Sequence, residues 1–456
     1  MMRRTICLTR LRHRSRVVLC LFIVFLAARG LPLCAQQPVS KFDIERFRIV
    51  LGNIKEDLKK NYYDPTYHGM DLDARFKAAD ETMRQATSLG QILGIIAQVM
   101  LDLNDSHTFF LPPGRSYRTD YGWRMRIIGD KCYVVAVERG SNAEAKGLKE
   151  GDEIYSIDGR YLPIRKDLWK IQYLYNALRP KPAVQLVIIK PDGQRQQLEV
   201  LAKVEQGKLI KDLTIEGYGT DIWDLERQSE QLSHLYRQRY VDMGDELFIW
   251  KMPEFDLTGP KIDGVADKFR KAKTLILDLR SNHGGAEETL LRLIGNFFDH
   301  DVKLGDLKRR KEEKTLIAKT RGGNAFAGKL IVLIDSESGS AAELLARVIQ
   351  LEKRGLVIGD RSAGAVMRAR EFSHDMGIDV KIFYGVSITD ADIIMNDGKS
   401  LEHVGVTPDE TRLPTPADLA ANRDPVLSYA ASLAGVTLSP EKAGELFPVE
   451  WYKAPR

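Results

Sequence analysis

A buried strand that turns directly into a helix is the feature that most constrains this fold. The unbroken apolar run Leu-Ile-Val-Leu-Ile at 330–334 predicts a strand covered on both faces. The small residues at 338–342 then predict a tight turn, and a helix is expected to begin near Glu343. A strand, a turn and a helix in this order are typical of α/β architecture.

Ser340 lies on this strand-to-helix corner, and the position suits a nucleophile. The unpaired amides and the positive end of the helix lie where an oxyanion would develop when a serine attacks a carbonyl. Serine is also a common helix cap, and Ser336, Ser338 and Ser340 could serve only in that role. This stretch alone supports both interpretations equally.

The first 35 residues have the pattern of a secretory signal. They contain seven arginines and no acidic residue, an apolar stretch covers 17–28, and Leu33-Cys34-Ala35 is an acceptable cleavage site. We therefore expect 1–35 to be a signal peptide and the protein to be exported, periplasmic or extracellular. A retained membrane anchor is the alternative, although the apolar run is short for a bilayer.

Loss of this leader would change both the charge and the cysteine content. The formal net charge is +5, and removal of seven arginines without any acid makes it −2, which argues against nucleic acid as a partner. Of the four cysteines only Cys132 lies beyond the leader, so no internal disulfide is expected. Membrane contact is expected only through an uncleaved leader.

The remainder of the chain divides into four segments by residue pattern. They are an N-terminal helical domain (36–115), a strand-rich domain (116–205), a core of alternating strands and helices (206–416) and a C-terminal helical tail (417–456). Residues 207–245 read as an exposed helical linker at the start of the core. The alternation in the core predicts helix-covered sheets with largely parallel strands, a mixed α/β fold.

The strand-rich segment resembles a PDZ domain. Ser141-Asn142-Ala143 and Gly147-Leu148, followed by Gly-Asp-Glu-Ile-Tyr-Ser-Ile-Asp-Gly at 151–159, cover most of that domain's signature. The resemblance implies a groove in which an extended peptide adds a strand and its C-terminal carboxylate meets backbone amides.

The carboxylate loop implied by this resemblance falls on Tyr121, Gly122 and Trp123. We therefore expect these three residues to bind peptides. A PDZ-like module that serves only as a spacer or lid is the alternative.

A second buried strand, at 275–280, ends in Ser-Asn-His-Gly-Gly at 281–285, where two glycines allow the backbone to approach a ligand closely. Together with the Ser340 corner, this exit resembles the C-terminal processing peptidase family. Six pieces occur in the family's order: Asp105-Ser106-His107-Thr108, the PDZ segment, the exit at 281–285, and the runs 338–343, 359–364 and 402–409. The resemblance implies a βαβ-spiral peptidase core of the ClpP and crotonase type, with an inserted PDZ domain and an N-terminal helical domain.

The same resemblance assigns the nucleophile to Ser340 and the oxyanion amides to Gly285 and Ala341. The bacterial processing branch carries a general-base lysine in a Phe-Gly-Lys-Gly run, and this chain has Ala-Gly-Ala-Val at 363–366. The absence of that lysine excludes the usual serine–lysine dyad at its usual place.

The sequence instead resembles the tricorn-core branch, whose tetrad combines a serine–histidine pair, a nucleophilic serine and a glutamate. Ser106, His107, Ser340 and Glu402 match these positions. Imidazole titrates near neutral pH and can accept a serine proton without the desolvation that a lysine base needs.

The resemblance therefore predicts an exported serine endopeptidase with a histidine base, whose PDZ domain binds peptides or unfolded proteins with free C-termini. The alternative is a non-catalytic protein that binds peptides or apolar ligands on the same fold. That protein would be expected to lose the serine or the histidine, and both are present. No metal or other cofactor is expected, because His283 and His403 lack a second ligand at metal-binding spacing. The sequence leaves open whether the protein forms a homo-oligomer.

Overall fold

The computed structural model describes residues 39–114, 117–206, 237–377 and 382–451. The expected signal peptide, 1–35, and most of the expected linker, 207–236, lie outside these described residues. Within the described ranges, no helix combines the length and the apolar character needed to cross a membrane.

The core of the molecule is a six-stranded sheet in the order β18-β15-β14-β11-β10-β9. Its strands are β9 (Arg239–Asp242), β10 (Leu247–Lys251), β11 (Thr274–Asp278), β14 (Lys329–Ile334), β15 (Gly355–Gly359) and β18 (Glu410–Thr411). Neighbours run parallel except β9, which is antiparallel to β10. The expectation of a helical linker is wrong for β9, because this short polar segment becomes a strand by pairing with the buried β10.

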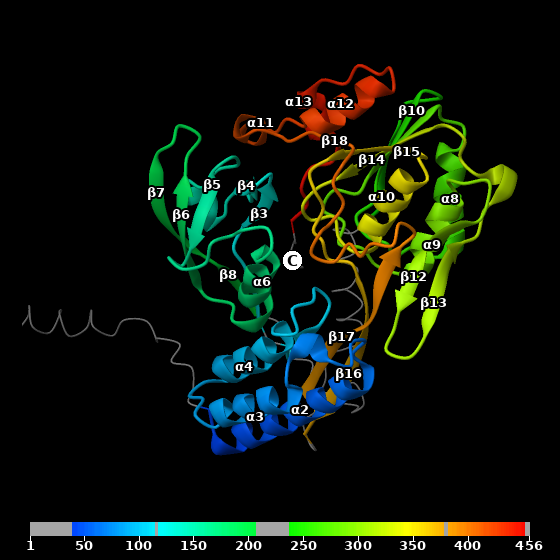
Figure 1. Cartoon of the computed structure of the whole chain (residues 1–456). Helices are drawn as coiled ribbons and strands as arrows, with labels where there is room; N and C mark the ends of the chain where they lie inside the picture. The colour runs from blue at the N-terminus through cyan, green and yellow to red at the C-terminus, as the bar shows by residue number, and fades with distance from the viewer. Residues whose placement is uncertain (1–38, 115–116, 207–236, 378–381, 452–456) are drawn as a thin grey trace, which may run out of the picture.

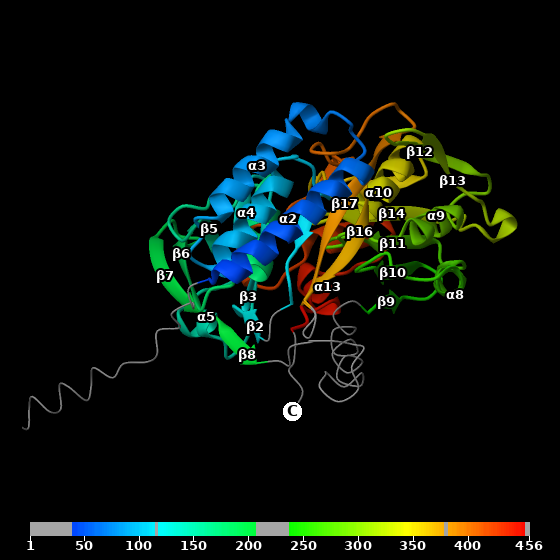
Figure 2. The same ribbon diagram turned by 90° about the horizontal axis from the view of Figure 1, so that it is seen from below.

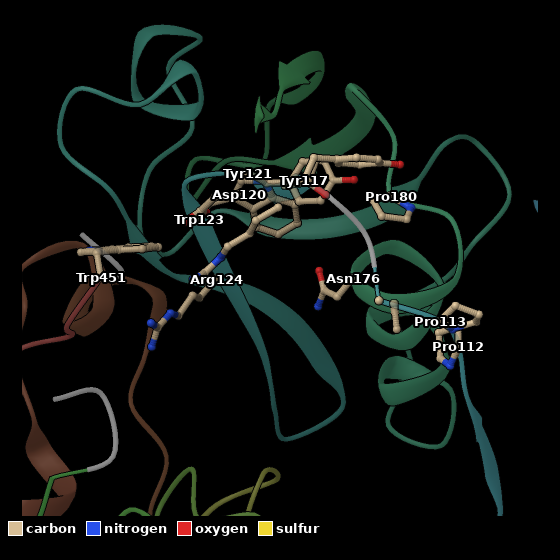
Figure 3. A pocket seen from close by; sticks show the side chains of 14 residues that line it. Pro112, Pro113, Tyr117, Asp120, Tyr121, Trp123, Arg124, Asn176, Pro180 and Trp451 are labelled. Atoms are coloured by element: carbon tan, nitrogen blue, oxygen red, sulfur yellow. The ribbon is translucent and has the colours of Figure 1, made fainter. Parts of the chain in front are cut away.

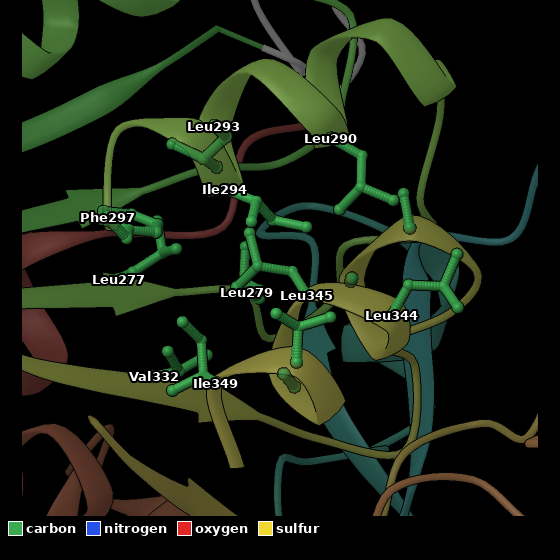
Figure 4. Packing of buried hydrophobic residues seen from close by; sticks show 14 of the residues in the cluster. Leu277, Leu279, Leu290, Leu293, Ile294, Phe297, Val332, Leu344, Leu345 and Ile349 are labelled. Carbon is green, nitrogen blue, oxygen red and sulfur yellow. The ribbon is translucent and has the colours of Figure 1, made fainter. Parts of the chain in front are cut away.

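Helices cover both faces of this sheet (Figure 1). One face packs against α8 (Gly259–Phe269), α9 (Glu287–Gly295) and α10 (Ala341–Leu351), and the other against α12 (Pro425–Leu433) and α13 (Pro440–Leu446). Figure 4 shows Leu277 and Val332 of the strands beside Leu293 and Ile349 of the helices, all of them buried. This layering confirms the predicted α/β core and the prediction that both apolar runs are buried strands.

A second, antiparallel sheet lies beside the core, in the order β1-β17-β12-β13 with β16 on β17. Its strands are β1 (Phe109–Leu111), β12 (Val302–Lys308), β13 (Glu313–Ala318), β16 (Met367–Met376) and β17 (Ile382–Met395), and the short helix η4 (Gly322–Asn324) follows β13. The largely parallel strands expected for 206–416 are found in the core sheet, whereas the strands of this second sheet pair antiparallel.

The N-terminal helices pack on this second sheet rather than forming a separate body. They are α2 (Lys41–Asn61), η1 (Tyr67–Gly69), α3 (Leu72–Met83) and α4 (Leu89–Leu101). Their core contains Phe110 of β1 and Tyr384, Val386 and Ile388 of β17. Figure 2 shows α2 running along β16 and β17. The segment between α4 and β1, which carries Ser106 and His107, is therefore held against the second sheet.

The PDZ-like segment forms its own five-stranded antiparallel sheet with a separate core. Its elements are β3 (Trp123–Ile128), β4 (Lys131–Val137), α5 (Asn142–Ala145), β5 (Glu153–Ile157), α6 (Leu168–Tyr173), η2 (Leu174–Leu178), β6 (Ala183–Ile189) and β7 (Arg195–Leu201), and β2 (Tyr117–Asp120) pairs with β8 (Lys203–Gln206). Strand β3 lies at the edge of the sheet.

The C-terminal residues 416–446 pack along the core as α11 (Pro416–Ala420), α12 and α13. Arg280, at the end of β11, links the strand to these helices, since it pairs with both Asp278 and Asp424. Asp424 caps α12 by accepting from the Leu427 amide at 2.9 Å.

Candidate active site

Ser340 occupies a strained position directly before α10. Its backbone has φ +52° and ψ −118°, a region that side-chain-bearing residues seldom adopt. The Ser340 amide donates to the Ala365 carbonyl at 2.8 Å and to the Glu343 carboxylate at 3.0 Å. The serine thus stands on the strand-to-helix corner that the sequence predicted, and two hydrogen bonds hold the strained turn.

Glu343 ties this turn to the loop that follows β15. Its buried carboxylate accepts from the Ser362 hydroxyl at 2.5 Å and from the amides of Gly364 and Ala365 at 2.8 and 3.0 Å, besides the Ser340 amide. Burial raises the pKa of Glu343 to about 7, although these hydrogen bonds favour the ionised form. The sequence interpretation gave Glu343 no role, and its position three residues after Ser340, the spacing of a capping box, was the available signal.

The glycine exit of β11 lies against the Ser340 turn. A Cβ added to Gly284 would stand 2.6 Å from the Cβ of Ser340 and 3.0 Å from the Ala341 amide nitrogen. Gly285 is equally confined, since a Cβ there would stand 2.4 Å from the Phe255 carbonyl oxygen. Within the described part of the chain, the amides of Gly285 and Ala341 have no acceptor. Both amides are therefore available to a ligand beside Ser340.

Ser106, His107 and Glu402 form one hydrogen-bonded group. The Ser106 hydroxyl lies 2.7 Å from His107 Nδ1 and 2.9 Å from Glu402 Oε2, and the Ser106 amide donates to Glu402 Oε1 at 2.7 Å. The Val366 amide donates to Glu402 Oε2 at 2.8 Å. The structure thus joins three of the four predicted tetrad residues, which are 296 positions apart at the extremes.

This network determines which nitrogen of the His107 ring is free. The Ser106 hydroxyl has one proton, and when it donates that proton to ionised Glu402 it can only accept from His107 Nδ1–H. The neutral ring then presents Nε2 as a proton acceptor. Burial lowers the pKa of His107, and the nearby Asp105 carboxylate acts in the opposite direction. The ring is therefore neutral at physiological pH.

Asp105 fixes the backbone around His107. One carboxylate oxygen accepts from the amides of His107 and Thr108 at 3.0 and 2.7 Å and from the Thr389 hydroxyl at 2.7 Å. The other accepts from the Tyr62 hydroxyl at 2.7 Å. The Ser106–His107 turn is thus anchored to both α2 and β17.

The Ser340 turn and the hydrogen-bonded group of Ser106, His107 and Glu402 meet through residues 365 and 366. Ala365 accepts from the Ser340 amide, and the next amide, that of Val366, donates to Glu402. Among the described residues no hydrogen bond joins His107 directly to Ser340, and catalytic hydrogen bonds are often long in ligand-free enzymes. The largely buried Lys251 donates to Asp278 and to the Arg280 carbonyl.

The residues expected to bind peptides lie at a cavity of about 570 Å³, which we call the PDZ pocket (Figure 3). Its lining comprises Pro112, Pro113, Gly114, Tyr117, Arg118, Thr119, Asp120, Tyr121, Trp123, Arg124, Asn176, Ala177, Pro180 and Trp451. Gly122 does not line it. The Gly122 amide donates to Asp120 at 2.9 Å, and a Cβ there would stand 2.5 Å from that of Ser141.

Comparison with known proteins bears on this geometry. Residues 249–412 match the model of peptidase family S41, and residues 119–201 match that of the PDZ domain. The chain therefore carries a peptidase S41 domain and a PDZ domain. This assignment confirms the resemblance to C-terminal processing peptidases and the predicted enzyme class, a serine peptidase.

Three curated relatives show the range of the similarity. The carboxyl-terminal-processing peptidase 1 of Arabidopsis thaliana is 24% identical over 70% of this chain and 62% of its own length. The carboxy-terminal processing protease CtpA of Bacillus subtilis is 23% identical over 82% of this chain and 71% of its own length. A putative tricorn protease homolog of Streptomyces coelicolor is 29% identical over 83% of this chain but only 31% of its own length.

Solved structures share the fold of this chain. Mature CPAF in complex with lactacystin superposes with a TM-score of 0.61 at 16% identity, and covers 86% of this chain and 98% of its own. The photosystem II D1 C-terminal processing protease gives a TM-score of 0.51 at 18% identity, over 90% of this chain and all of its own. Both confirm the predicted fold class.

A metal centre has no support in the described ranges, where no three histidine, cysteine or acidic side chains gather around one point. His403, one of the two histidines beside the motifs, pairs through Nε2 with the Asn104 carbonyl at 2.8 Å.

Proposed function

We propose that this chain is a serine endopeptidase in which His107 is the general base for Ser340, with Ser106 and Glu402 as positioning residues. The observation that carries the proposal is the Ser106 hydroxyl, which bridges His107 Nδ1 and Glu402 at 2.7 and 2.9 Å. Because this bridge leaves Nε2 unprotonated, the buried ring has one acceptor for the proton of a nucleophile.

The reaction follows the general course of acyl transfer by an activated serine. Ser340 Oγ bonds to the carbonyl carbon of the scissile peptide, and its proton passes to His107 Nε2. The amides of Gly285 and Ala341 donate to the oxyanion that develops. His107 then gives the proton to the departing amine, and a water molecule, deprotonated by the same ring, releases the acyl group from Ser340.

The imidazolium formed in this course needs a nearby negative charge. Glu402 supplies it through the Ser106 hydroxyl, in the way that the third member of a triad supports its histidine. Burial raises the pKa of Glu402, whereas the hydrogen bonds from Val366 and Ser106 favour its ionised form. Those three donated bonds support an ionised carboxylate at neutral pH.

The substrates that fit this proposal are peptides or unfolded proteins with free C-termini, bound in the PDZ pocket. The pocket lies at the edge strand β3, where an extended chain can add as a further strand. A relative from Haemophilus influenzae is named a tail-specific protease. The leader pattern of residues 1–35 supports an exported enzyme, and N-terminal sequencing of the mature protein tests that: a chain that starts at Met1 contradicts it.

The catalytic assignment is tested with a fluorophosphonate probe and with peptide hydrolysis. We expect the wild type to be labelled and Ser340→Ala to be unlabelled. His107→Ala, Ser340→Ala and the double variant should lose about the same activity, because nucleophile and base act as a unit.

Near-normal turnover by His107→Ala beside an inactive Ser340→Ala would mean that another base serves the serine. If all three variants hydrolyse peptides as the wild type does, the alternative, a binding protein on the same fold, is favoured.

A further inference from the structure

A segment from the C-terminal end of the described chain reaches the PDZ pocket. Arg124, which directly follows the carboxylate loop, donates from Nη2 to the Glu450 carbonyl at 2.6 Å. Its guanidinium also lies over the Trp451 ring, 5.0 Å from the ring centre. The domain expected to bind peptide termini is therefore in contact with a peptide segment of the same molecule.

The peptidase core holds this segment from the other side. Arg239 of β9 donates to the Pro448 carbonyl at 2.9 Å, and Arg237 binds the Glu450 carboxylate at 2.6 Å. Residues 448–451 thus bridge β9 and the PDZ domain through three arginines. The contact is a defined one, since backbone carbonyls, a carboxylate and an aromatic ring all take part.

Trp451 forms one wall of the PDZ pocket, across from Pro112 and Pro113 (Figure 3). Trp123, from the carboxylate loop, contributes a buried indole N–H that has no acceptor among the described residues. An incoming terminal carboxylate would meet the positive charge of Arg124, which lines the pocket. The positive charge is already engaged by Glu450 and Trp451.

We propose that Glu450 and Trp451 act as an internal competitor for the PDZ pocket. The proposal rests on the proposed function of that pocket as a peptide-binding site. A peptide carboxylate that pairs with Arg124 must first break the bond to the Glu450 carbonyl and remove the Trp451 ring from the guanidinium. Because the segment is tethered, its effective concentration is high, and only the fraction of molecules with the segment released binds peptide. The segment therefore restrains recognition until a terminus of sufficient affinity arrives.

The experiment measures binding of fluorescent peptides to the full chain in a Ser340→Ala background, which prevents cleavage. Each peptide is prepared with a free and with an amidated C-terminus. In Trp451→Ala we expect binding of the free-carboxylate peptide to tighten by about 3- to 30-fold, the factor expected when a competing closed state is removed. A chain shortened to end at Val449 should show the same gain.

Val449→Ala is the matched control. Val449 belongs to the same segment, its side chain is 45% exposed and it does not line the pocket, so its variant should bind like the parent. Unchanged or weaker binding in Trp451→Ala overturns the proposal, and weaker binding would make Trp451 a wall of the peptide site. If no variant distinguishes free from amidated peptides, the peptide-binding function itself fails, an outcome that is recognised before any comparison of Trp451 with Val449.

Discussion

The Ser106 hydroxyl gives the His107 ring a single orientation and a single free nitrogen. Because it donates to Glu402 and accepts from Nδ1, it excludes the tautomer in which Nε2 carries the proton. Asp105 fixes the same turn through the backbone amides of His107 and Thr108. Both constraints are in place without a substrate, so the proposed proton transfer from Ser340 to His107 would need little reorganisation.

The pH dependence of hydrolysis should report His107. Its pKa is lowered from 6.5 by burial, so the neutral, basic form persists to a lower pH than for an exposed imidazole. We expect kcat/KM to rise with pH through a midpoint below about 6.5 and then to level off. The measurement is a pH profile with a peptide that has no group titrating between about pH 4 and 8. A midpoint above that of free imidazole would contradict the burial argument.

The free energy of unfolding should also depend on pH, through Glu343. The folded-state pKa of Glu343 is about 7 against an ordinary value of 4.5, so the folded protein keeps a proton that the unfolded chain has already lost. The free energy of unfolding must therefore fall as pH rises from about 4.5 to about 7, by an amount on the order of 3 kcal/mol from this group.

Glu343→Gln removes this titration and provides the comparison. Urea melts at a series of pH values measure the free energy of unfolding of both proteins. The value for the wild type minus the value for the variant should decrease as the pH rises through that window. A difference independent of pH would show that Glu343 is ionised throughout in the folded state.

At the scale of elements, the sequence predicted the buried apolar strands well and the exposed polar strand poorly. Strands β11 and β14 are apolar on both faces, and each was predicted close to its observed bounds. Strand β16, with the sequence Met-Arg-Ala-Arg-Glu-Phe-Ser-His-Asp-Met, carries mostly polar residues and was missed. It is a strand because ten of its residues pair with β17, a partner that local sequence does not reveal.

The same limit applies to the site. Ser340, Ser106, His107 and Glu402 were singled out because each belongs to a recognisable motif, yet only the fold shows that Ser106 bridges two of them. Nothing in the local sequence indicated that Arg126 of the PDZ domain would contact the peptidase loops. Contacts between segments about 200 residues apart depend on how the domains dock, and this docking cannot be predicted from a single sequence.

The anchoring of α12 gives a test at this scale. Asp424 caps the helix through the Leu427 amide and pairs in bidentate fashion with buried Arg280, at 3.0 and 2.7 Å. Asp424→Ala removes both interactions and should lower the free energy of unfolding by about 3 kcal/mol. Asp424→Asn keeps the cap and loses the charge, so it should cost less. Urea melts measure both, and equal effects in the two variants would assign no stability to the cap.

At the scale of the whole molecule, Arg126 joins the PDZ domain to both loops that flank Ser340. From the edge strand β3 it reaches Glu337 at 2.9 Å, Asp335 at 3.2 Å and the Ser281 hydroxyl at 2.6 Å. Asp335 in turn accepts from the Ser281 amide at 2.9 Å. The glycine exit of β11 and the turn that leads to Ser340 are thus held together by a side chain of the PDZ domain.

A second contact places the nucleophile loop on the backbone of the same strand. The Ser336 hydroxyl donates to the Ile127 carbonyl of β3 at 2.5 Å. Because β3 is the edge strand to which a peptide would add, a change in β3 on peptide binding has a short path to the loop that ends at Ser340.

Arg126→Met tests this connection, since methionine keeps part of the aliphatic stem and loses the charge. Asp335 and Glu337 are then left without their cation, and the loops that carry Ser340 and Gly285 lose a shared anchor. We expect kcat to fall by about 10- to 100-fold, as small misplacements of reacting groups do, while the affinity for free-carboxylate peptides stays within about twofold because Arg126 does not line the PDZ pocket. Lys131→Ala is the control: it removes an exposed ion pair with Glu153 on the neighbouring strand and should leave kcat unchanged. An unchanged kcat in Arg126→Met would show that the two loops hold their geometry without the PDZ domain.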